Sequence, residues 1–229
     1  MASICIIPAR GGSKRIPGKN IKPFLGRPII AYAIQTALES GIFDRVVVST
    51  DDEAIATVAR QYGAEVPFMR SAANSDDYAP VVDVLIEVVN HYRSISMSFD
   101  EVACLFATAP FIHASLIQHV HQLLDHETDS AFTVQNFGFP IFRALKKDES
   151  GNVSMFWPEN LNTRSQDLPQ AFHDAGQLYW IKTQVLLDER KMYTSKSKGF
   201  EMDRLDAIDI DTESDWKIAE TLYKLKAGI

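Results

Sequence analysis

The sequence has little cysteine, no excess of positive charge and no long apolar run, and each shortage excludes a class of protein. Two cysteines among 229 residues cannot build a disulfide scaffold. Acidic residues outnumber basic ones by 30 to 23, for a net charge of −7, so the broad positive field that binds nucleic acid is missing. No stretch reaches the ~20 apolar residues of a membrane span. We therefore expect neither a nucleic-acid partner nor a membrane partner, whereas a small anionic ligand would need only a local basic pocket.

The composition is otherwise that of an ordinary folded domain. Hydrophobic residues make up 46% of the chain and charged residues 23%, as is typical of globular proteins, and the length fits a single domain of residues 1–229. Cys5 and Cys104 both lie in apolar runs, so we expect buried, reduced thiols, with a disulfide between neighbouring strands as the alternative. Because the chain also begins without a secretory signal pattern, we expect a cytoplasmic protein.

Strand-like and helix-like patterns alternate along the first 135 residues. The expected strands are Ser3–Pro8, Arg45–Thr50, Glu65–Met69, Glu101–Ala107 and Ser130–Gln135. The expected helices between them are Pro28–Ser40, Asp51–Tyr62, Pro80–Arg93 and Ala114–His126. This succession predicts an α/β fold, a doubly wound, mostly parallel sheet with helices on both faces. Ligands of such sheets bind beyond the carboxyl ends of the strands, so the loops after Pro8, Thr50 and Ala107 are the first candidates for a site.

The pattern changes after Phe137. The runs Arg143–Lys147 and Val153–Phe156 are separated by turn-forming residues and predict a hairpin. We expect residues 138–170 to form a small insertion that covers the site or makes the contact of a homodimer, because its aromatic side chains would otherwise be an exposed apolar patch. A strand is expected to resume at Leu178–Ile181.

The last expected helix is Thr212–Lys226. It starts from an Asp-Thr cap, and Asp215 stands at its third helical position, which is the arrangement of a capping box.

The most informative segment is the loop directly after the first strand. It contains two glycines and a hydroxyl, Gly11, Gly12 and Ser13, and four cations, Arg10, Lys14, Arg15 and Lys19. Glycines let the backbone approach a phosphate, and closely spaced N–H groups bind anions. Neither the Walker sequence nor the dinucleotide fingerprint Gly-x-Gly-x-x-Gly is present. The loop therefore predicts a triphosphate site of another kind, and the alternative is a solvated charged loop.

This loop resembles the signature of sugar-activating nucleotidyltransferases, most closely that of the CMP–nonulosonic acid synthetases, also called acylneuraminate cytidylyltransferases. Further segments resemble this family in the same order, so that the resemblance covers nearly the whole chain: Phe43–Asp51, Val66–Arg70 with Ser75 and Asp76, Ala107–Pro110, and Ile208–Thr212. The resemblance implies a Rossmann-like nucleotidyltransferase fold. It also implies an enzyme that joins CTP and an acidic nine-carbon α-keto sugar into a CMP-sugar, with release of pyrophosphate.

Asp209 and Asp211 form the second chemical motif. Two residues apart in an extended segment, they present both carboxylates to one side, which suits a hard cation such as Mg²⁺. Asp211 alone could equally be a helix N-cap. The resemblance implies that the pair holds the catalytic Mg²⁺ or another divalent cation.

Residues 162–177 are dense in hydrogen-bonding side chains, and they read either as an exposed loop or as a sugar site. Sialic acid synthetases tend to carry an arginine where this chain has His173, and a Gln-Pro-Thr-Ser-Pro-like segment where it has Phe106–Phe111. These departures resemble the branch of the family that uses pseudaminic acid. The alternatives are sialic, legionaminic or 3-deoxy-manno-octulosonic acid as the sugar, or a nucleotide-binding module without catalysis.

The resemblance implies a role for each candidate residue. The catalytic residues would be Arg10, Lys19 and Asp211. The nucleotide would contact Ala9, Arg10, Gly11, Gly12, Ser13, Lys14, Lys19, Asn20, Arg70 and Ser75. The sugar would contact Thr108, Arg164, Gln166, His173, Asp174 and Gln177.

Overall fold

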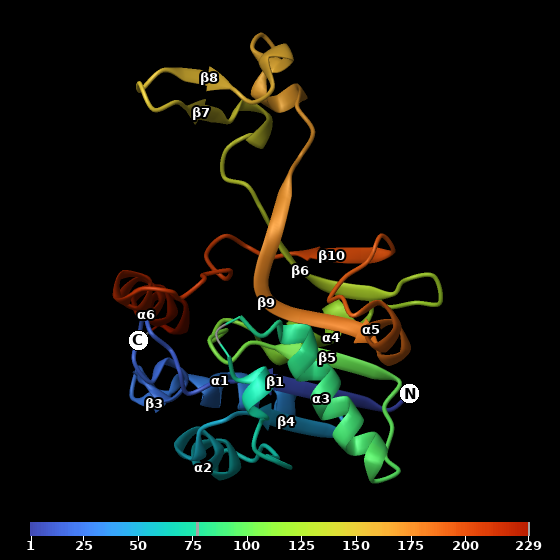
Figure 1. The fold of residues 1–229 in the computed structure, drawn as a ribbon. Helices are drawn as coiled ribbons and strands as arrows, with labels where there is room; N and C mark the ends of the chain where they lie inside the picture. Colours follow the sequence, from blue (N-terminus) through green and yellow to red (C-terminus); the bar gives the residue numbers. More distant parts are fainter. Residues whose placement is uncertain (77, 229) are drawn as a thin grey trace.

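Residues 1–76 and 78–228 are described by the computed structural model, and within them a central sheet of six strands organises the chain (Figure 1). The strands are β1 (Ser3–Pro8), β4 (Arg45–Ser49), β5 (Glu101–Leu105), β6 (Ser130–Asn136), β9 (Phe172–Lys182) and β10 (Ser197–Glu201), in the order β10-β6-β9-β5-β1-β4. All neighbours are parallel except β9, which runs antiparallel to both β5 and β6. The expected mostly parallel sheet is confirmed.

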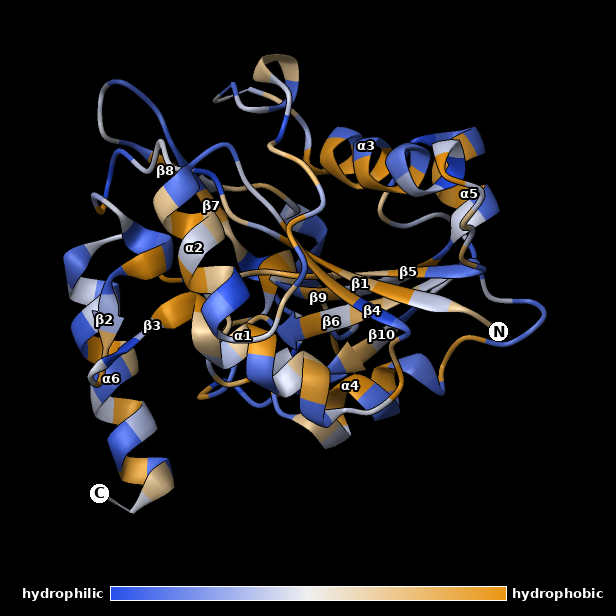
Figure 2. Ribbon diagram, turned by 90° about the horizontal axis from the view of Figure 1, so that it is seen from below, coloured by the Kyte–Doolittle hydropathy of each residue, from blue (hydrophilic) through white to orange (hydrophobic). Residues whose placement is uncertain are grey.

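Helices cover both faces of this sheet. Apolar side chains of α1 (Ile29–Glu39), α2 (Glu53–Gln61) and α4 (Ala114–His121) pack on one face. Those of α3 (Val81–Ser94) and α5 (Thr183–Glu189) pack on the other. Figure 2 shows the apolar strands lying between these two layers. The doubly wound arrangement follows from strands such as β1 and β5, whose residues are apolar on both faces.

The cysteines illustrate how the register assigns side chains to faces. Cys5 of β1 lies opposite Ala103 of β5, and Ile6 lies opposite Cys104. The two thiols therefore point to opposite faces of the sheet, since successive strand residues alternate. Both are buried and free, as expected, and burial raises the pKa of each thiol. The register rules out the alternative of a disulfide between them.

A third apolar cluster joins the segment after β1 to the last helix of the chain. The short antiparallel strands β2 (Pro23–Phe24) and β3 (Arg27–Pro28) follow the loop after β1, and α6 (Glu213–Ala227) packs beside them. Phe24 makes edge-to-face contacts with Tyr32, Trp216 and Tyr223. The expected capping box at the start of α6 is present: the Thr212 hydroxyl accepts from the Asp215 N–H, and the Asp215 carboxylate accepts from the Thr212 N–H. This packing brings the segment before α6 against the loop after β1.

Residues 138–170, which we call the arm, leave the sheet between β6 and β9. They contain the expected hairpin, here β7 (Leu145–Lys147) and β8 (Val153–Met155), and three short 3-10 turns, Ile141–Arg143, Pro158–Asn160 and Ser165–Asp167. Figure 1 shows that the arm stands away from the rest of the molecule. Several of its apolar side chains are exposed, among them Phe139, Leu145, Val153, Phe156 and Leu161.

Three expected elements differ in the structure. The strand expected at Glu65–Met69 is reduced to a single bridge between Val47 and Glu65, and α4 ends at His121 rather than His126. β9 begins at Phe172, six residues before the expected strand, because its first part pairs with β6 where β6 has passed the end of β5. Among the described residues, no helix is long and apolar enough to cross a membrane.

Candidate active site

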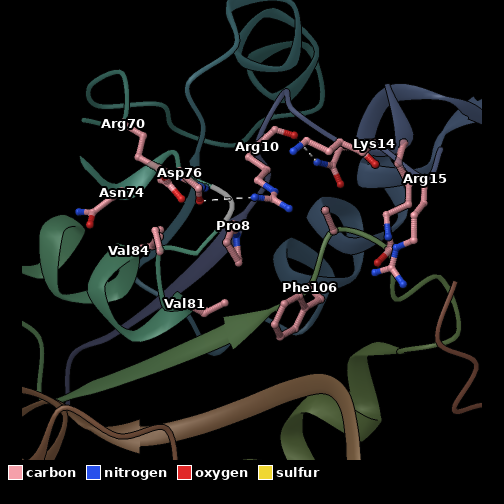
Figure 3. A pocket seen from close by; sticks show the side chains of 16 residues that line it. Pro8, Arg10, Lys14, Arg15, Arg70, Asn74, Asp76, Val81, Val84 and Phe106 are labelled. Atoms are coloured by element: carbon pink, nitrogen blue, oxygen red, sulfur yellow. Dashed lines mark hydrogen bonds between the residues drawn. The ribbon is translucent and has the colours of Figure 1, made fainter. Parts of the chain in front are cut away.

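A cavity of about 510 Å³ lies at the carboxyl ends of β1 and β5 (Figure 3). Within the described part of the chain, its walls come from the end of β1, the loop after it, the turn before α3, the first turn of α3 and the loop after β5. The lining residues are Pro8, Arg10, Ser13, Lys14, Arg15, Lys19, Asn20, Arg70, Asn74, Asp76, Ala79, Val81, Val84, Phe106, Ala107 and Thr108. Two of the three loops singled out in the sequence, those after Pro8 and Ala107, thus form the cavity.

The cavity is basic although the chain is acidic. Its described walls carry five cations, Arg10, Lys14, Arg15, Lys19 and Arg70, against the single carboxylate of Asp76. Figure 3 shows Arg10, Lys14 and Arg15 on the loop after β1, facing Arg70 and Asp76 across the cavity. Arg10 Nη1 donates to the Asp76 carbonyl oxygen at 3.4 Å, and this hydrogen bond connects the loop after β1 with the segment before α3. A polyanion of the size of a nucleoside triphosphate would be neutralised here.

The loop after β1 is held in its shape by the neighbouring strand end. The Ala9 N–H donates to the Ser49 carbonyl at 2.9 Å, and the Gly11 N–H donates to the Asp51 carboxylate at 2.9 Å. A side chain at position 11 would put its Cβ 2.7 Å from an Asp52 carboxylate oxygen, so only glycine fits. The Asn20 amide donates to the Arg10 carbonyl at 2.9 Å. The third loop, after Thr50, therefore contacts the loop after β1 and fixes its shape without lining the cavity in its described part.

Arg70 forms the inner wall. It is buried, its Nε donates to the Ser49 hydroxyl at 3.0 Å, and a second guanidinium nitrogen donates to the Ser49 carbonyl. Burial lowers the pKa of Arg70, while the charges of Asp51 and Glu87 oppose this shift. A fixed, partly desolvated cation of this kind presents strong donors to whatever part of a ligand reaches the wall.

The segment Asp209–Asp211 lies against the cation loop. Lys19 Nζ donates to the Ile210 carbonyl at 2.8 Å and lies 3.6 Å from the Asp211 carboxylate. Arg15 Nη1 lies 2.7 Å from the other oxygen of Asp211. The helix N-cap at this place is Thr212 and not Asp211, so the Asp211 carboxylate is left for ionic contacts.

The carboxylate pair fits a hard divalent cation. Partial desolvation raises the pKa of Asp209, and the neighbouring charge of Asp211 raises it further, so a cation between the two would relieve their repulsion. No group of three or more His, Cys, Asp or Glu side chains that could hold a metal occurs in residues 1–76 and 78–228. A magnesium ion typically takes one or two carboxylates and completes its shell with water and substrate phosphates. The two aspartates beside the basic cavity supply such a partial shell.

The structure brings together seven of the nucleotide and sugar residues expected from the sequence as cavity walls. These are Arg10, Ser13, Lys14, Lys19, Asn20, Arg70 and Thr108. Ala9, Gly11 and Gly12 form the loop itself without lining the cavity in its described part, and the Ser75 hydroxyl donates to the Ser71 carbonyl at 2.8 Å.

The remaining expected sugar residues lie elsewhere. Arg164 and Gln166 are on the arm, where Arg164 pairs with Asp167 at 2.6 Å. His173 and Asp174 are at the exposed start of β9, and the Asp174 carboxylate accepts from the Tyr179 hydroxyl at 2.6 Å. Gln177 is buried. Among the described residues of a single chain, only Thr108 of this set lines the cavity.

Several cavity residues escaped the sequence reasoning. Asp76 belongs to the motif that the resemblance named but was given no role, and Asn74 directly precedes that motif, so their place in the chain was the available signal. Val81 and Val84 line the cavity from the first turn of α3. Their spacing of three is that of an ordinary helix face, which gives no signal of a ligand.

Comparisons with known proteins bear on the family and the fold of the chain. The sequence profile of the family described as Cytidylyltransferase matches residues 4–227. The pseudaminic acid cytidylyltransferase of Campylobacter jejuni subsp. jejuni serotype O:2 is 42% identical over 226 residues, covering 98% of this chain and 97% of that one. The CMP-N,N'-diacetyllegionaminic acid synthase of Legionella pneumophila is 31% identical over 229 residues, with coverages of 98% and 97%.

Solved structures share the fold. The structure of CMP:2-keto-3-deoxy-manno-octonic acid synthetase complexed with CTP superposes with a TM-score of 0.71 at 18% identity, covering 99% of this chain and 100% of that chain. The 4-diphosphocytidyl-2C-methyl-D-erythritol synthase of Anaerococcus prevotii superposes with a TM-score of 0.63 at 12% identity, with coverages of 97% and 98%. Both are nucleotidyltransferase folds of the expected Rossmann-like type. With its motifs in order along nearly its whole length and a basic cavity at the expected strand ends, the chain belongs to the cytidylyltransferase family.

Proposed function

We propose that this enzyme is a pseudaminic acid cytidylyltransferase, which joins CTP and pseudaminic acid into the CMP-sugar and releases pyrophosphate. The observation that carries the proposal is the cavity with five cations that faces the Asp209–Asp211 carboxylates across Lys19. The choice of sugar is supported by the 42% identity to the Campylobacter enzyme over nearly the full length of both chains.

In the proposed reaction the anomeric hydroxyl of the sugar attacks the α-phosphorus of CTP. The new P–O bond forms as the bond to pyrophosphate breaks, and the hydroxyl proton is released, so that the products are the CMP-sugar, pyrophosphate and a proton. Such a transfer depends mainly on positioning and on neutralising charge. Arg10 and Lys19 would neutralise charge on the phosphates, while Ser13, Lys14 and Asn20 help hold the triphosphate or ribose. Arg70 would donate to the base at the inner wall.

Asp209 and Asp211 would hold Mg²⁺ beside the triphosphate. When bound, such an ion neutralises phosphate charge and polarises the reacting phosphoryl group. Arg15 and Lys19 also pair with the Asp211 carboxylate, and both cations lie on the loop that would bind the phosphates.

We also propose that the enzyme is a homodimer in which the arm of one protomer lies near the site of its partner. Arg164 and Gln166, the residues expected at the sugar, stand on the arm and outside the described cavity walls of their own chain. The exposed apolar side chains of the arm support the same arrangement, because patches of this kind mark association sites. A cytoplasmic location is supported by the two free thiols, which are usual in a reducing compartment.

A pyrophosphate-release screen tests the proposed function. The purified enzyme with Mg²⁺ would be offered CTP, ATP, GTP and UTP in turn with pseudaminic, legionaminic, sialic and 3-deoxy-manno-octulosonic acids. We expect the highest kcat/KM for CTP with pseudaminic acid. Preference for another of these sugars would overturn the substrate but leave a cytidylyltransferase. CTP binding without turnover of any sugar would favour a non-catalytic nucleotide-binding module.

A further inference from the structure

A buried amide near the carboxylate pair, Gln177, was expected at the sugar from the sequence but does not line the described cavity walls. Gln177 of β9 is only 2% exposed. Its Nε2 donates to the carbonyl oxygens of Asp206 and Ile208, at 3.3 and 3.4 Å. Both partners can only accept, so the nitrogen of the amide must face them. Gln177 therefore donates twice to the segment that leads into the carboxylate pair.

The side chain reaches this segment because β9 is irregular here. The register between β9 and β6 shifts near Phe132 and Val134, and Gly176 adopts a φ of +64°, as in a β-bulge that re-aims a strand. The Asp174 carboxylate stabilises the irregular stretch by accepting from the Gly176 N–H at 2.8 Å. The Gln177 carbonyl accepts from the Phe106 N–H at 2.9 Å. The donor is thus mounted on the sheet itself and not on a loop.

Every second carbonyl of the segment is held in this way. Those of Asp206 and Ile208 accept from Gln177, and that of Ile210 accepts from Lys19. Asp206 ends a turn in which its N–H donates to the Asp203 carbonyl at 2.9 Å, and residues 207–211 lead from this turn to the start of α6. Fixing the carbonyls of 206, 208 and 210 therefore restrains the backbone that carries the Asp209 and Asp211 side chains.

Packing alone does not account for a glutamine at this place. The Oε1 of Gln177 is buried and has no hydrogen-bond partner in the described part of the chain, which is unfavourable for an acceptor. A methionine has a similar length and would leave no such atom unpaired. What the amide contributes is donation to the two carbonyls.

We propose that Gln177 is a positioning residue that holds the Asp209 and Asp211 carboxylates ready for a divalent cation, and that it does not contact the sugar. The inference rests on the proposed function, because the cation is the one expected to bind with CTP.

The test compares two variants of the full-length enzyme, Gln177→Met and Thr133→Val. The first removes both donors. The second is a matched control on the neighbouring strand β6, since the buried Thr133 hydroxyl bonds with the backbone of Leu178 in β9 and not with the 206–208 segment. Three quantities are measured: the Kd of Mn²⁺ by electron paramagnetic resonance with CTP present and sugar absent, the KM for pseudaminic acid, and the Tm.

Gln177→Met should weaken Mn²⁺ binding about tenfold, the lower end of what residues behind metal ligands contribute, and leave the sugar KM unchanged. Thr133→Val should lower the Tm without changing the Kd of Mn²⁺. If Gln177→Met does not fold, Gln177→Asn keeps an amide that is one methylene too short to reach the carbonyls, and it should give the same result.

Unchanged Mn²⁺ affinity in the Gln177 variant would overturn the inference, and a raised sugar KM with unchanged Mn²⁺ affinity would return Gln177 to the sugar site. If the wild-type enzyme binds CTP but no Mn²⁺, this would instead contradict the metal site of the proposed function. The role of Gln177 as a positioning residue would then fall as well. The two failures are distinguishable because the first appears only in the variant.

Discussion

Lys19 joins the two chemical motifs of the site through a single side chain. It lines the cavity, donates to the Ile210 carbonyl and lies near the Asp211 carboxylate. It can therefore orient the carboxylate segment and also neutralise charge on a bound triphosphate.

We predict that Lys19→Met lowers kcat by about 10²- to 10³-fold, the effect of removing one electrostatic donor from a transition state. Lys22→Met is the matched control, because Lys22 pairs with Glu213 at the start of α6 and lies outside the described cavity walls. The control should lose stability at most. Steady-state kinetics at saturating CTP would contradict the assignment if the Lys19 variant kept the wild-type kcat.

Asp211 gives a second prediction at this scale. Asp211→Asn keeps the shape of the side chain and the backbone contacts but removes one charge, so turnover at limiting Mg²⁺ should fall steeply. The Tm of the variant should change little, since the ion pairs of Asp211 with Arg15 and Lys19 are partly exposed.

Asp83→Asn is a control of equal exposure, because the Asp83 side chain is 30% exposed, against 29% for Asp211, and also pairs with an arginine, Arg190. Activity titrated against Mg²⁺ separates the two variants. Near wild-type activity of Asp211→Asn at low Mg²⁺ would exclude Asp211 as a metal ligand.

Single residues also show how far sequence reasoning reaches. The cations of the loop after β1 could be predicted because the glycines, the hydroxyl and the charges stand together in the chain. The contacts of Gln177 could not, because its partners lie 29 and 31 residues away and depend on a shift of register in β9. Patterns of neighbouring residues predict sites built from one segment, whereas contacts between residues far apart in the chain become visible only in the fold.

The capping box of α6 connects stability to the site at the scale of elements. It begins the helix directly after Asp211, and the Asp215 carboxylate also accepts from the Asp211 N–H at 3.1 Å. The hydrogen bond from the Thr212 hydroxyl, followed by that from the Thr212 N–H, lowers the pKa of Asp215.

We predict that Thr212→Ala lowers the free energy of unfolding by about 1 kcal/mol at neutral pH. Because the pKa of Asp215 is lowered in the folded state, its contribution is complete above the unfolded-state pKa of ~3.9 and is lost as the pH falls through the folded-state value. The difference between wild type and variant should thus shrink in acid. Thermal unfolding at pH 7 and near pH 3 measures it, and an equal difference at both pH values would contradict the role of Asp215.

One of the elements missed from the sequence is a strand without an apolar pattern. β10 reads Ser-Lys-Gly-Phe-Glu and lies at the edge of the sheet, half exposed. It is a strand because it pairs with β6 and not because of its composition. The strands β1, β4 and β5 each have an apolar, buried centre and were predicted within two residues of their ends.

At the scale of the whole molecule, the arm is the proposed dimer contact. We predict that Phe156→Glu converts a dimer into monomers, because it places a charge on the exposed apolar surface of the arm. Leu225→Glu is the control: Leu225 is also exposed but lies on α6. Light scattering over the micromolar range reports the mass, and a monomeric wild type would contradict the dimer.

The place of β9 in the sheet has a consequence for how the chain folds while it is being synthesised. β1, β4 and β5 can pair with one another as soon as they have left the ribosome, but β6 finds its partners in β9 and β10. While the arm, with its exposed apolar side chains, is being synthesised, the backbone N–H and C=O groups on both edges of β6 therefore have no strand to pair with. Unpaired strand edges favour aggregation of nascent chains. β9, which pairs with both β5 and β6 and so connects the two parts of the sheet, is synthesised late. The ribosome must therefore translate β9 before the central sheet can form completely.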